Sequence, residues 1–323
     1  MKYKILLLLF TAFISLFAVR QALADGGTVV YERWIGTDNY VMMSDRDGRN
    51  ERKLFIGYDA EISPDGSKIA YTWVSDDAPN ERYIAVYDIA AKKNNILKHI
   101  PGTNNYAPRW SPNGKKILFN QYYQEKKWLP GIYDTEKKST KTVAVKLTPP
   151  DKKKQLYSDV YSPFWSHNGE YIYGNDLKYI YKFSAADGKQ VDAIPMSAIF
   201  SKHAMIDSSI RFSSSADGNS WLFSVEQSNE KCGRCEASVA LEPLKGITYE
   251  YKLKEKKTVR ISPADFCTGY AAYGTKGDIY ISAHKTSEKP RQSANYYDIY
   301  LISAADKKIT PIAQKAYEAS VSK

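Results

Sequence analysis

One phrase recurs along the chain and limits the folds that are open to it. The phrase begins with an aromatic residue, continues through Ser-Pro-Asp-Gly or a variant, and ends in an apolar run. Three clear copies and two looser ones cover Tyr58–Tyr71, Tyr106–Phe119, Tyr161–Tyr173, Ser209–Phe223 and Cys267–Ile281. Repetition on this scale is typical of solenoids and propellers, in which one supersecondary unit is stacked many times.

Each copy of the phrase predicts a β-hairpin. Pro presets φ in a turn, Asp or Asn hydrogen-bonds the nearby backbone, and Gly adopts the positive φ. The flanking residues alternate or run apolar, as paired strands do. We therefore predict structural turn roles for Pro64, Asp65, Gly66, Pro112, Asn113, Gly114, Asn168, Gly169, Asp217 and Gly218.

A second series of polar turns gives an independent count of the units. These turns lie at Ser44–Gly48, Asp88–Asn94, Asp134–Ser139, Ser184–Lys189, Lys254–Thr258 and Ser303–Lys308, which makes six units against five phrases. The first unit begins at Thr28–Trp34 and lacks an inner strand. The segment Tyr317–Ser322 has the shape of Tyr58–Ser63 and can supply that strand.

These observations predict an all-β, six-bladed β-propeller of four-stranded antiparallel blades. The C-terminal strand would pair with the N-terminal blade, which closes the ring and removes an open sheet edge. The 299 residues after residue 24 give about 50 per blade, within the range of propeller repeats. The 26 Tyr favour the same class, because Tyr suits half-buried pleated surfaces.

The segments Ser63–Tyr71 (SPDGSKIAY) and Trp110–Phe119 (WSPNGKKILF) resemble the repeats of the TolB propeller family and of other TolB-like and WD40-like propellers. The resemblance covers residues 25–323. It implies a non-catalytic scaffold that binds a protein of the cell envelope. TolB proteins also carry an α/β domain before the propeller, and we expect that domain to be lacking here, because the repeats begin almost directly after residue 24.

The first 24 residues have the pattern of a secretory signal peptide. Lys2 and Lys4 precede the apolar run Ile5–Val19, and Ala22-Leu23-Ala24 is a small-x-small cleavage signal. We predict a signal peptide at 1–24, a propeller domain at 25–323, a periplasmic or secreted location, and no integral membrane segment after cleavage. The alternative is an uncleaved anchor, although the apolar run is shorter than the ~20 residues that a spanning helix needs.

The three cysteines leave several alternatives open. Cys232 and Cys235 form a C-x-x-C in a polar insertion, Gln227–Glu236, between strands of the fifth blade. In an oxidising compartment a local Cys232–Cys235 disulfide is the preferred interpretation. The alternatives are pairing of one of them with Cys267, which lies in an expected inner strand, and a redox or metal role.

No catalytic residue is predicted. The four His stand singly, and the chain has no HExxH, no Gly-x-Ser-x-Gly elbow, no P-loop and no dinucleotide fingerprint. No cofactor or metal is expected, and the alternative is calcium in the channel, held by recurring turn residues such as Asp65 and Asn113. Those side chains more simply cap their own turns.

Aromatic residues on long loops are the candidate binding surface. Tyr122, Tyr123 and Trp128 lie on the long loop of the third blade, and Tyr296 and Tyr297 lie on the sixth. Large amphipathic rings on loops suit protein contacts or stacking on sugar rings. The alternative for each ring is packing between blades.

Three functions remain open at this stage. The first is binding of a cell-envelope protein by a monomer, through one mouth of the channel and the long loops of blades three, five and six. The second is recognition of a glycan or other anionic polymer, since the net charge is +10 for the whole chain and +7 without the three cations of residues 1–24. The third is a polysaccharide lyase or hydrolase that uses the channel. No nucleic-acid partner is expected.

Overall fold

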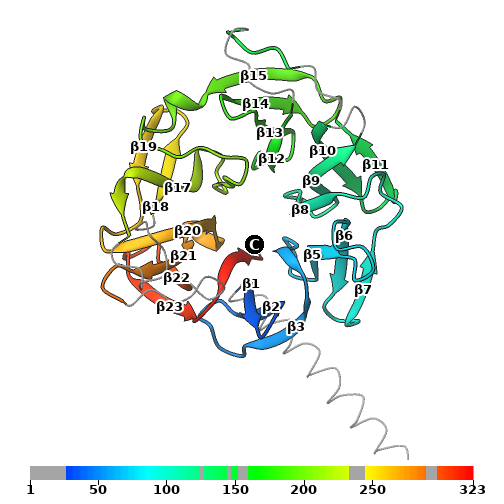
Figure 1. Cartoon of the computed structure of the whole chain (residues 1–323), viewed down its shortest axis with the longest axis horizontal. Helices are drawn as coiled ribbons and strands as arrows, with labels where there is room; N and C mark the ends of the chain where they lie inside the picture. The colour runs from blue at the N-terminus through cyan, green and yellow to red at the C-terminus, as the bar shows by residue number, and fades with distance from the viewer. Residues whose placement is uncertain are drawn as a thin grey trace, which may run out of the picture.

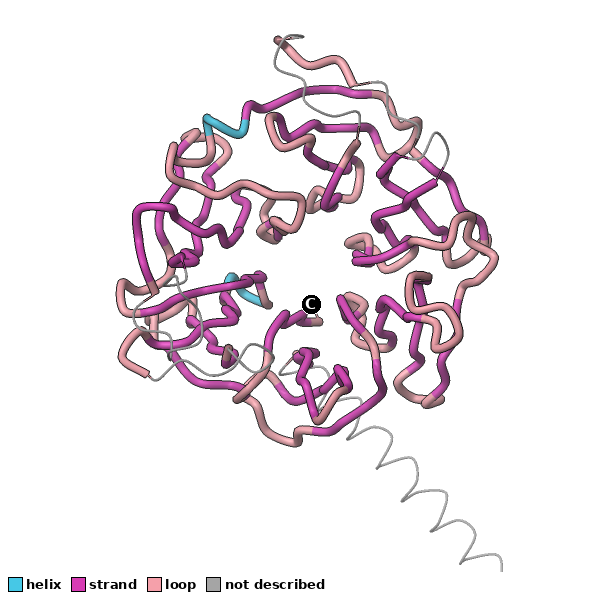
Figure 2. The backbone as a smooth tube through the Cα atoms, viewed as in Figure 1, coloured by secondary structure: helices cyan, strands magenta, loops and turns pink. Residues whose placement is uncertain are grey.

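The computed structural model describes residues 27–123, 127–143, 147–151, 159–232, 244–288 and 297–322. Within them, strands β1 to β24 form six four-stranded antiparallel sheets that stand as blades around a central axis (Figure 1). The helical elements of these residues are two single 3₁₀ turns, η2 (Met196–Ala198) and η3 (Thr275–Gly277), so strands and loops make up the ring (Figure 2). The predicted all-β, six-bladed propeller is confirmed.

The blades follow one another along the chain, each with its first strand nearest the axis and its fourth at the rim (Figure 1). Blade 1 contains β24 (Tyr317–Val321), β1 (Thr28–Ile35), β2 (Asp38–Asp45) and β3 (Arg52–Ile56), and blade 2 contains β4 (Tyr58–Ile62), β5 (Lys68–Val74), β6 (Arg82–Asp88) and β7 (Lys93–Ile96). Blade 3 contains β8 (Asn105–Trp110), β9 (Lys116–Tyr123), β10 (Lys127–Asp134) and β11 (Ser139–Thr142), and blade 4 contains β12 (Tyr161–Trp165), β13 (Tyr171–Asn175), β14 (Tyr179–Ser184) and β15 (Gln190–Pro195). Blade 5 contains β16 (Phe212–Ser214), β17 (Ser220–Lys231), β18 (Leu244–Lys252) and β19 (Lys257–Arg260), and blade 6 contains β20 (Phe266–Tyr273), β21 (Ile279–Lys285), β22 (Asp298–Ile302) and β23 (Ile309–Ala313).

The last strand of the chain completes the first blade. β24 pairs with β1 in antiparallel register, with Val321 opposite Val29 and Ser320 opposite Val30. Beyond the strand, the Thr28 backbone N–H donates to Ser322 Oγ at 2.9 Å. β24 and β1 therefore lie side by side near the axis, and the predicted closure of the ring is confirmed (Figure 1).

The hydrophobic core lies between the blades. On β5, Ile69 and Tyr71 pack in a buried cluster shared with blade 1, while Ala70 packs in a cluster shared with blade 3. Each of the six blade boundaries has such a cluster within the described residues. Because both faces of a blade are buried, successive residues of its strands are apolar, and most aromatic rings fill these boundaries.

The recurring Ser-Pro-Asp-Gly turns are held by their own side chains. In blade 2, Ser63 Oγ accepts from the Lys68 backbone N–H at 2.9 Å and donates to Asp65 Oδ1 at 2.6 Å. Gly66 has a φ of 71°, the conformation for which glycine is favoured. The same Ser-to-Asp or Ser-to-Asn bond recurs in the next three blades. In blades 2 to 5, this turn therefore fixes where the second strand of the blade begins.

Among the described residues, no helix is both long enough and apolar enough to span a bilayer. The predicted signal peptide at 1–24 lies outside them and stays a prediction.

Candidate functional site

The first strands of blades 1 to 4 each contain a bulge at the residue that follows the first Tyr of the strand. Asp59, Ala107, Ser162 and Glu318 occupy this position and have φ values of 46° to 55°. The strand register shifts at the same places. A bulge redirects a side chain, and a positive φ outside Gly is a strained state that clusters at functional sites. The bulges are therefore features that shape the channel.

Two of these bulge residues are acidic and share one arginine. Arg211, which directly precedes β16, donates from Nη1 to Glu318 Oε2 at 2.6 Å and from Nη2 to Asp59 Oδ1. Thr72 Oγ1 donates to the other oxygen of Asp59 at 2.7 Å. Asp59 belongs to blade 2 and Arg211 to blade 5, which stand opposite each other in a six-bladed ring. We call Arg211, Asp59 and Glu318 the channel cluster, since their contacts span the channel.

Burial and mutual charges shift the pKa of each member of the channel cluster. Burial raises the pKa of Asp59, but Arg211 and the Thr72 hydroxyl outweigh it and hold that pKa below its usual value. For Glu318, burial and the nearby Asp59 outweigh Arg211, so the pKa of Glu318 is raised. Burial lowers the pKa of Arg211, and the two carboxylates more than reverse this. The arginine is thus a permanent cation between two acids of different strength.

A third acid, Glu32 of β1, lies against this cluster and is 1% exposed. Its carboxylate accepts from Asn39 Nδ2 at 2.5 Å and from the Ala60 backbone N–H at 3.1 Å. Burial, followed by the charges of Glu318 and Asp59, raises the pKa of Glu32 well above its usual value. Glu32 is therefore an acid that the fold favours in its protonated form.

Other blades have a polar side chain that makes the same kind of contact as Glu32. A polar side chain on the second strand of one blade accepts from the N–H of the bulge residue of the next blade, or of the residue after it, and the distances are 2.9 to 3.1 Å. The pairs are Glu32 with Ala60, Thr72 with Ala107, Asn120 with Ser162, and Ser282 with Glu318. These bonds link neighbouring blades and hold the bulges in position, so Glu32 also has a structural role.

The channel opens at two different ends. The turn mouth is the end at which the Ser-Pro-Asp-Gly turns lie, and it holds a cavity of about 110 Å³ lined by Pro64, Pro112 and His167 among others. The loop mouth is the opposite end, where the first strands begin and the second strands lead into the third. A cavity of about 320 Å³ opens there, lined by Asp207, Glu226 and Tyr297 with the channel-cluster residues Arg211 and Glu318.

The loop mouth holds the described part of the predicted aromatic surface. Tyr122 is 39% exposed, and its ring lies 5.0 Å from that of Trp128. Trp128 also meets Tyr106 edge-on at 5.2 Å, and the Arg82 guanidinium lies 4.0 Å above the Tyr106 ring. We call Arg82, Tyr106, Tyr122 and Trp128 the aromatic corner. Tyr106 also lines a second cavity of about 110 Å³ at this mouth.

The remaining predicted aromatic residues do not join the aromatic corner. Tyr297 lies in blade 6, where its ring packs on Gly269 and lines the cavity of about 320 Å³. Tyr296 lies outside the described residues, and only the backbone of Tyr123 is described, at the end of β9. The structure thus places Tyr122 and Trp128 together and Tyr297 apart from them, on the same mouth.

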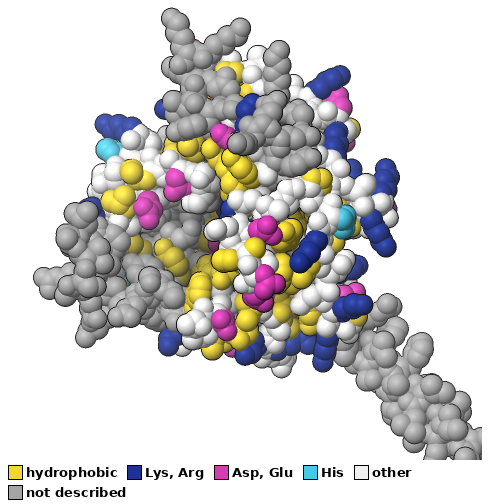
Figure 3. Space-filling model, turned by 45° about the vertical axis from the view of Figure 1, so that its right-hand side comes forward, with side chains coloured by type: hydrophobic (Ala, Val, Ile, Leu, Met, Phe, Trp, Pro, Cys, Tyr) yellow, Lys and Arg dark blue, Asp and Glu magenta, His cyan; other side chains and the backbone are white. Residues whose placement is uncertain are grey.

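Charges are unevenly distributed over the surface. In Figure 3, Lys and Arg side chains project mainly from the outer rim, whereas Asp and Glu side chains gather nearer the central hollow. The cavity of about 320 Å³ is lined by Asp207, Glu226 and Glu318 against one cation, Arg211. Burial and the charge of Asp207 raise the pKa of Glu226. The lining of this cavity therefore holds more acidic than basic side chains, on a protein whose net charge is positive.

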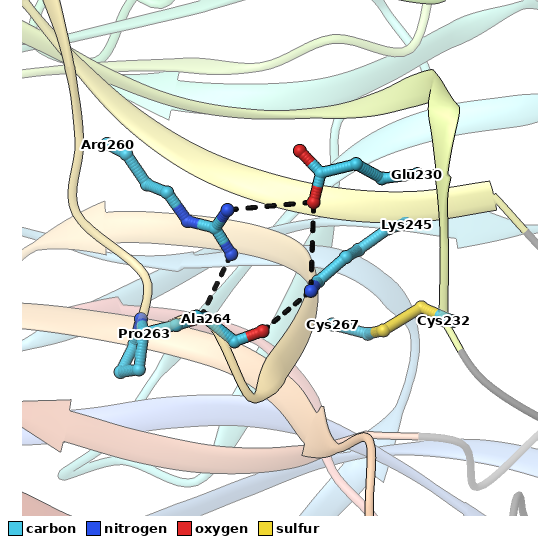
Figure 4. The surroundings of a disulfide bond; sticks show 7 residues. All are labelled: Glu230, Cys232, Lys245, Arg260, Pro263, Ala264 and Cys267. Carbon is cyan, nitrogen blue, oxygen red and sulfur yellow. Dashed lines mark hydrogen bonds and ion pairs between the residues drawn. A yellow bond between two sulfur atoms is a disulfide. The ribbon is translucent and has the colours of Figure 1, made fainter.

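The structure corrects the preferred disulfide. Cys232 is bonded to Cys267 of β20, with their Cα atoms 5.8 Å apart, so the local Cys232–Cys235 bond is wrong (Figure 4). The reason is that β17 continues to Lys231, through the start of the expected insertion, and delivers Cys232 to blade 6. Cys235 lies outside the described residues. The alternative pairing with Cys267 is the one that the fold uses, and it joins blades 5 and 6.

Sequence reasoning missed the channel cluster. Asp59 and Glu318 are the second residues of two segments already recognised as equivalent, Tyr58–Ser63 and Tyr317–Ser322. Arg211 occupies the corresponding place before Phe212 in the looser fourth copy. A comparison of that one position across the copies would have found two acids and a base facing a common axis.

Comparisons with known proteins place the fold. Searches of protein-family models and of curated protein sequences find no match. Among solved structures, the chain is similar to TolB from Acinetobacter baumannii, with a TM-score of 0.60 and 15% identity over 94% of this chain and 70% of that one. A protein assigned as TolB from Agrobacterium tumefaciens gives 0.57 and 10% over 92% and 98%. A chain of the nidogen/laminin complex gives 0.58 and 7% over 92% and 99%. The fold is therefore that of a TolB-like six-bladed propeller.

Proposed function

We propose that this protein is a non-catalytic binding protein of the periplasm, which engages a protein partner of the cell envelope through its loop mouth. The location rests on the signal-peptide pattern of residues 1–24. The fold of the two TolB structures supports the same class of role, and so does the propeller-like chain of the nidogen/laminin complex. Fold alone does not assign function, so the proposal depends on the site.

The observation that carries the proposal is the form of the loop mouth. An open cavity of about 320 Å³ and the exposed aromatic corner lie on the same end of a rigid ring. Behind them, Arg211 bridges Asp59 and Glu318 across the channel. A ligand that enters from this mouth therefore meets a charged floor, and its contacts are made with the rim. Aromatic anchors beside a pocket are typical of protein-binding surfaces.

The acidic lining of the cavity of about 320 Å³ favours a protein over an anionic polymer. An acidic polysaccharide would approach Asp207, Glu226 and Glu318, and like charges in a cavity repel it. A protein segment with basic or neutral side chains meets no such barrier. On the face drawn in Figure 3, Lys and Arg side chains project mainly from the outer rim.

A glycan remains the second candidate because of the aromatic corner. The Tyr122 and Trp128 rings lie 5.0 Å apart with Tyr122 exposed, an arrangement on which a neutral sugar ring can stack. Catalysis is less well supported. Asp59 and Glu318 are both engaged by Arg211, and Glu32 is held by Asn39 and Ala60, so these three acids lack the free, paired arrangement of glycoside cleavage.

Partner capture tests the proposal. Residues 25–323 would be used as bait for a native envelope fraction, and captured proteins and glycans would be identified by mass spectrometry. Two variants change the loop mouth on exposed side chains, Tyr122→Ala and Glu226→Lys. We expect a saturable protein partner whose capture falls with either variant.

His167→Ala is the matched control, because His167 lines the turn mouth at the other end of the channel. It should capture the partner as well as the unchanged protein does. Equal loss in all three variants would place the contact elsewhere. Recovery of polysaccharide alone would favour the glycan candidate instead.

A further inference from the structure

Three buried side chains with metal-binding atoms converge where blades 5 and 6 meet. Cys232 follows β17, Cys267 lies on β20, and His284 lies on β21, and they are 6%, 1% and 6% exposed. The Sγ atoms of Cys232 and Cys267 and one ring nitrogen of His284 all lie within 4.8 Å of one another. In this structure the two sulfurs are joined as a disulfide, with the imidazole beside them.

The sheet of blade 6 places two of these groups together. Cys267 and His284 are directly opposite each other in the β20–β21 ladder, so their side chains share one face of the blade. Blade 5 lies close against this ladder, since a Cβ on Gly246 of β18 would come within 1.9 Å of the Thr268 carbonyl oxygen. Two of the three ligand positions, Cys267 and His284, are therefore set by regular strand pairing, and Cys232 follows directly after the end of β17.

Charged side chains lie around the disulfide (Figure 4). The Lys245 ammonium and the Arg260 guanidinium share a single carboxylate, that of Glu230, at 3.7 and 3.6 Å. Lys245 also donates to the Ala264 carbonyl oxygen at 2.6 Å. Lys245, Arg260 and Glu230 therefore form a polar network beside the disulfide.

We propose that the Cys232–Cys267 disulfide is the oxidised state of a zinc site that His284 completes. A dithiol reductant supplies two electrons and two protons, becomes a disulfide itself, and leaves two thiols on the protein. Zn²⁺ then binds the two sulfurs and displaces their protons to solvent. Two thiolates and a neutral imidazole with Zn²⁺ have no net charge, which suits a buried site, whereas a monovalent ion would leave one negative charge.

This site lies next to residues that line the loop mouth. The Tyr297 ring is centred 6.0 Å from that of His284, and the same Tyr297 lines the cavity of about 320 Å³. Thr268 and Gly269, which follow Cys267, line that cavity too. Cys267 is therefore the immediate neighbour of a residue that lines the loop mouth. Replacement of the disulfide by bound zinc would take place next to that surface. The inference itself does not depend on what the mouth binds.

Cobalt substitution and zinc competition test the proposal on the full chain. Reduced and oxidised protein would be titrated with Co²⁺, whose thiolate charge-transfer and visible bands report sulfur ligands and tetrahedral geometry, and then with Zn²⁺. We expect one equivalent to bind to the reduced protein and none to the oxidised protein. Zn²⁺ should also raise the melting temperature of the reduced protein, since a ligand stabilises the state that binds it.

Two variants separate this site from chelation by the C-x-x-C pair. Cys235→Ser should keep the bound equivalent, and His284→Gln should lose it while its oxidised form keeps the wild-type near-ultraviolet circular dichroism. Loss on Cys235→Ser with retention on His284→Gln would overturn the proposal, because the metal would then be held by Cys232 and Cys235. Absence of Co²⁺ and Zn²⁺ binding by the reduced wild-type protein, together with an unchanged melting temperature, would overturn it as well.

Discussion

Arg211 is the residue on which the charges of the channel depend. Its guanidinium touches both Glu318 and Asp59, and its side chain is 18% exposed. Removal of one partner from a buried ion pair leaves the other charge uncompensated, which is far more costly than loss of a surface pair. The cluster is thus a place where a single substitution affects three blades.

We expect Arg211→Gln to lower the free energy of unfolding by about 3–5 kcal/mol near neutral pH. The loss should shrink toward about pH 5, because the uncompensated carboxyls then take up protons in the folded state. Urea denaturation at both pH values measures this. Lys115→Gln removes the same charge from an exposed pair with Glu136 and should change stability by less than about 1 kcal/mol. Equal effects of the two variants would contradict the role of Arg211.

We expect Glu32 to make the free energy of unfolding fall as the pH rises, the opposite of what a carboxylate paired with a cation does. Its pKa in the folded protein lies well above the usual 4.5, so above that pH the folded state holds a proton that the unfolded state has lost. Stability therefore falls as pH rises from 4.5 toward the folded pKa. Glu32→Gln removes this slope, and the variant should gain stability relative to the wild-type protein as the pH rises above 4.5.

Glu51→Gln is the control for this measurement. Arg33 holds the pKa of Glu51 below its usual value, despite a smaller opposing effect of burial, so Glu51 is ionised in both states above about pH 5. Its stability curve should run parallel to that of the wild-type protein in that window. Parallel curves for Glu32→Gln as well would show that Glu32 is ionised in the folded protein.

At the scale of the element, the hairpin turns were predictable and the bulges were not. A turn such as Ser63–Gly66 is held by hydrogen bonds between residues that are close in the sequence, so the local sequence is enough to predict it. A bulge at Asp59 depends on the N–H acceptor of a neighbouring blade, and its charge matters only beside Arg211, 152 residues away. The channel cluster therefore exists only once the ring has formed.

The disulfide shows the same limit. A C-x-x-C pair suggests a local bond by proximity in sequence, but the length of β17 decides which sulfur Cys232 reaches. Strand length is set by pairing with β18, which continues to Lys231 through an irregular register. That information is not contained in the spacing of the cysteines.

We expect the Cys232–Cys267 bond to be a stabilising link between blades. The bond spans 35 residues, for which loop-closure entropy gives about 3–4 kcal/mol. The double variant Cys232→Ala, Cys267→Ala should lose about that much, measured on oxidised protein in the presence of a chelator. Cys235→Ser should retain wild-type stability. A loss in Cys235→Ser as large as in the double variant would mean that the structural bond involves Cys235.

At the scale of the whole molecule, closure is what connects the ends of the chain to the channel. β24 covers the edge of β1, and it also carries Glu318 to Arg211 and Ser320 to the Ile62 backbone N–H at 3.1 Å. The mismatch between five phrases and six turns predicted this strand, since only a closed ring needs it. The same strand therefore completes a blade, seals an edge and supplies an acid of the channel cluster.

Deletion of residues 315–323 should therefore destabilise every blade at once. It removes β24, exposes the β1 edge to pairing with other chains, and leaves Arg211 with one carboxylate in place of two. We expect loss of the cooperative thermal transition, or aggregation, measured by circular dichroism and light scattering. A synthetic peptide of residues 315–323, added in excess, should restore the transition in part because it can occupy the vacant edge, whereas a scrambled peptide should not. A truncated protein that melts at the wild-type temperature would show that the ring holds without its closing strand.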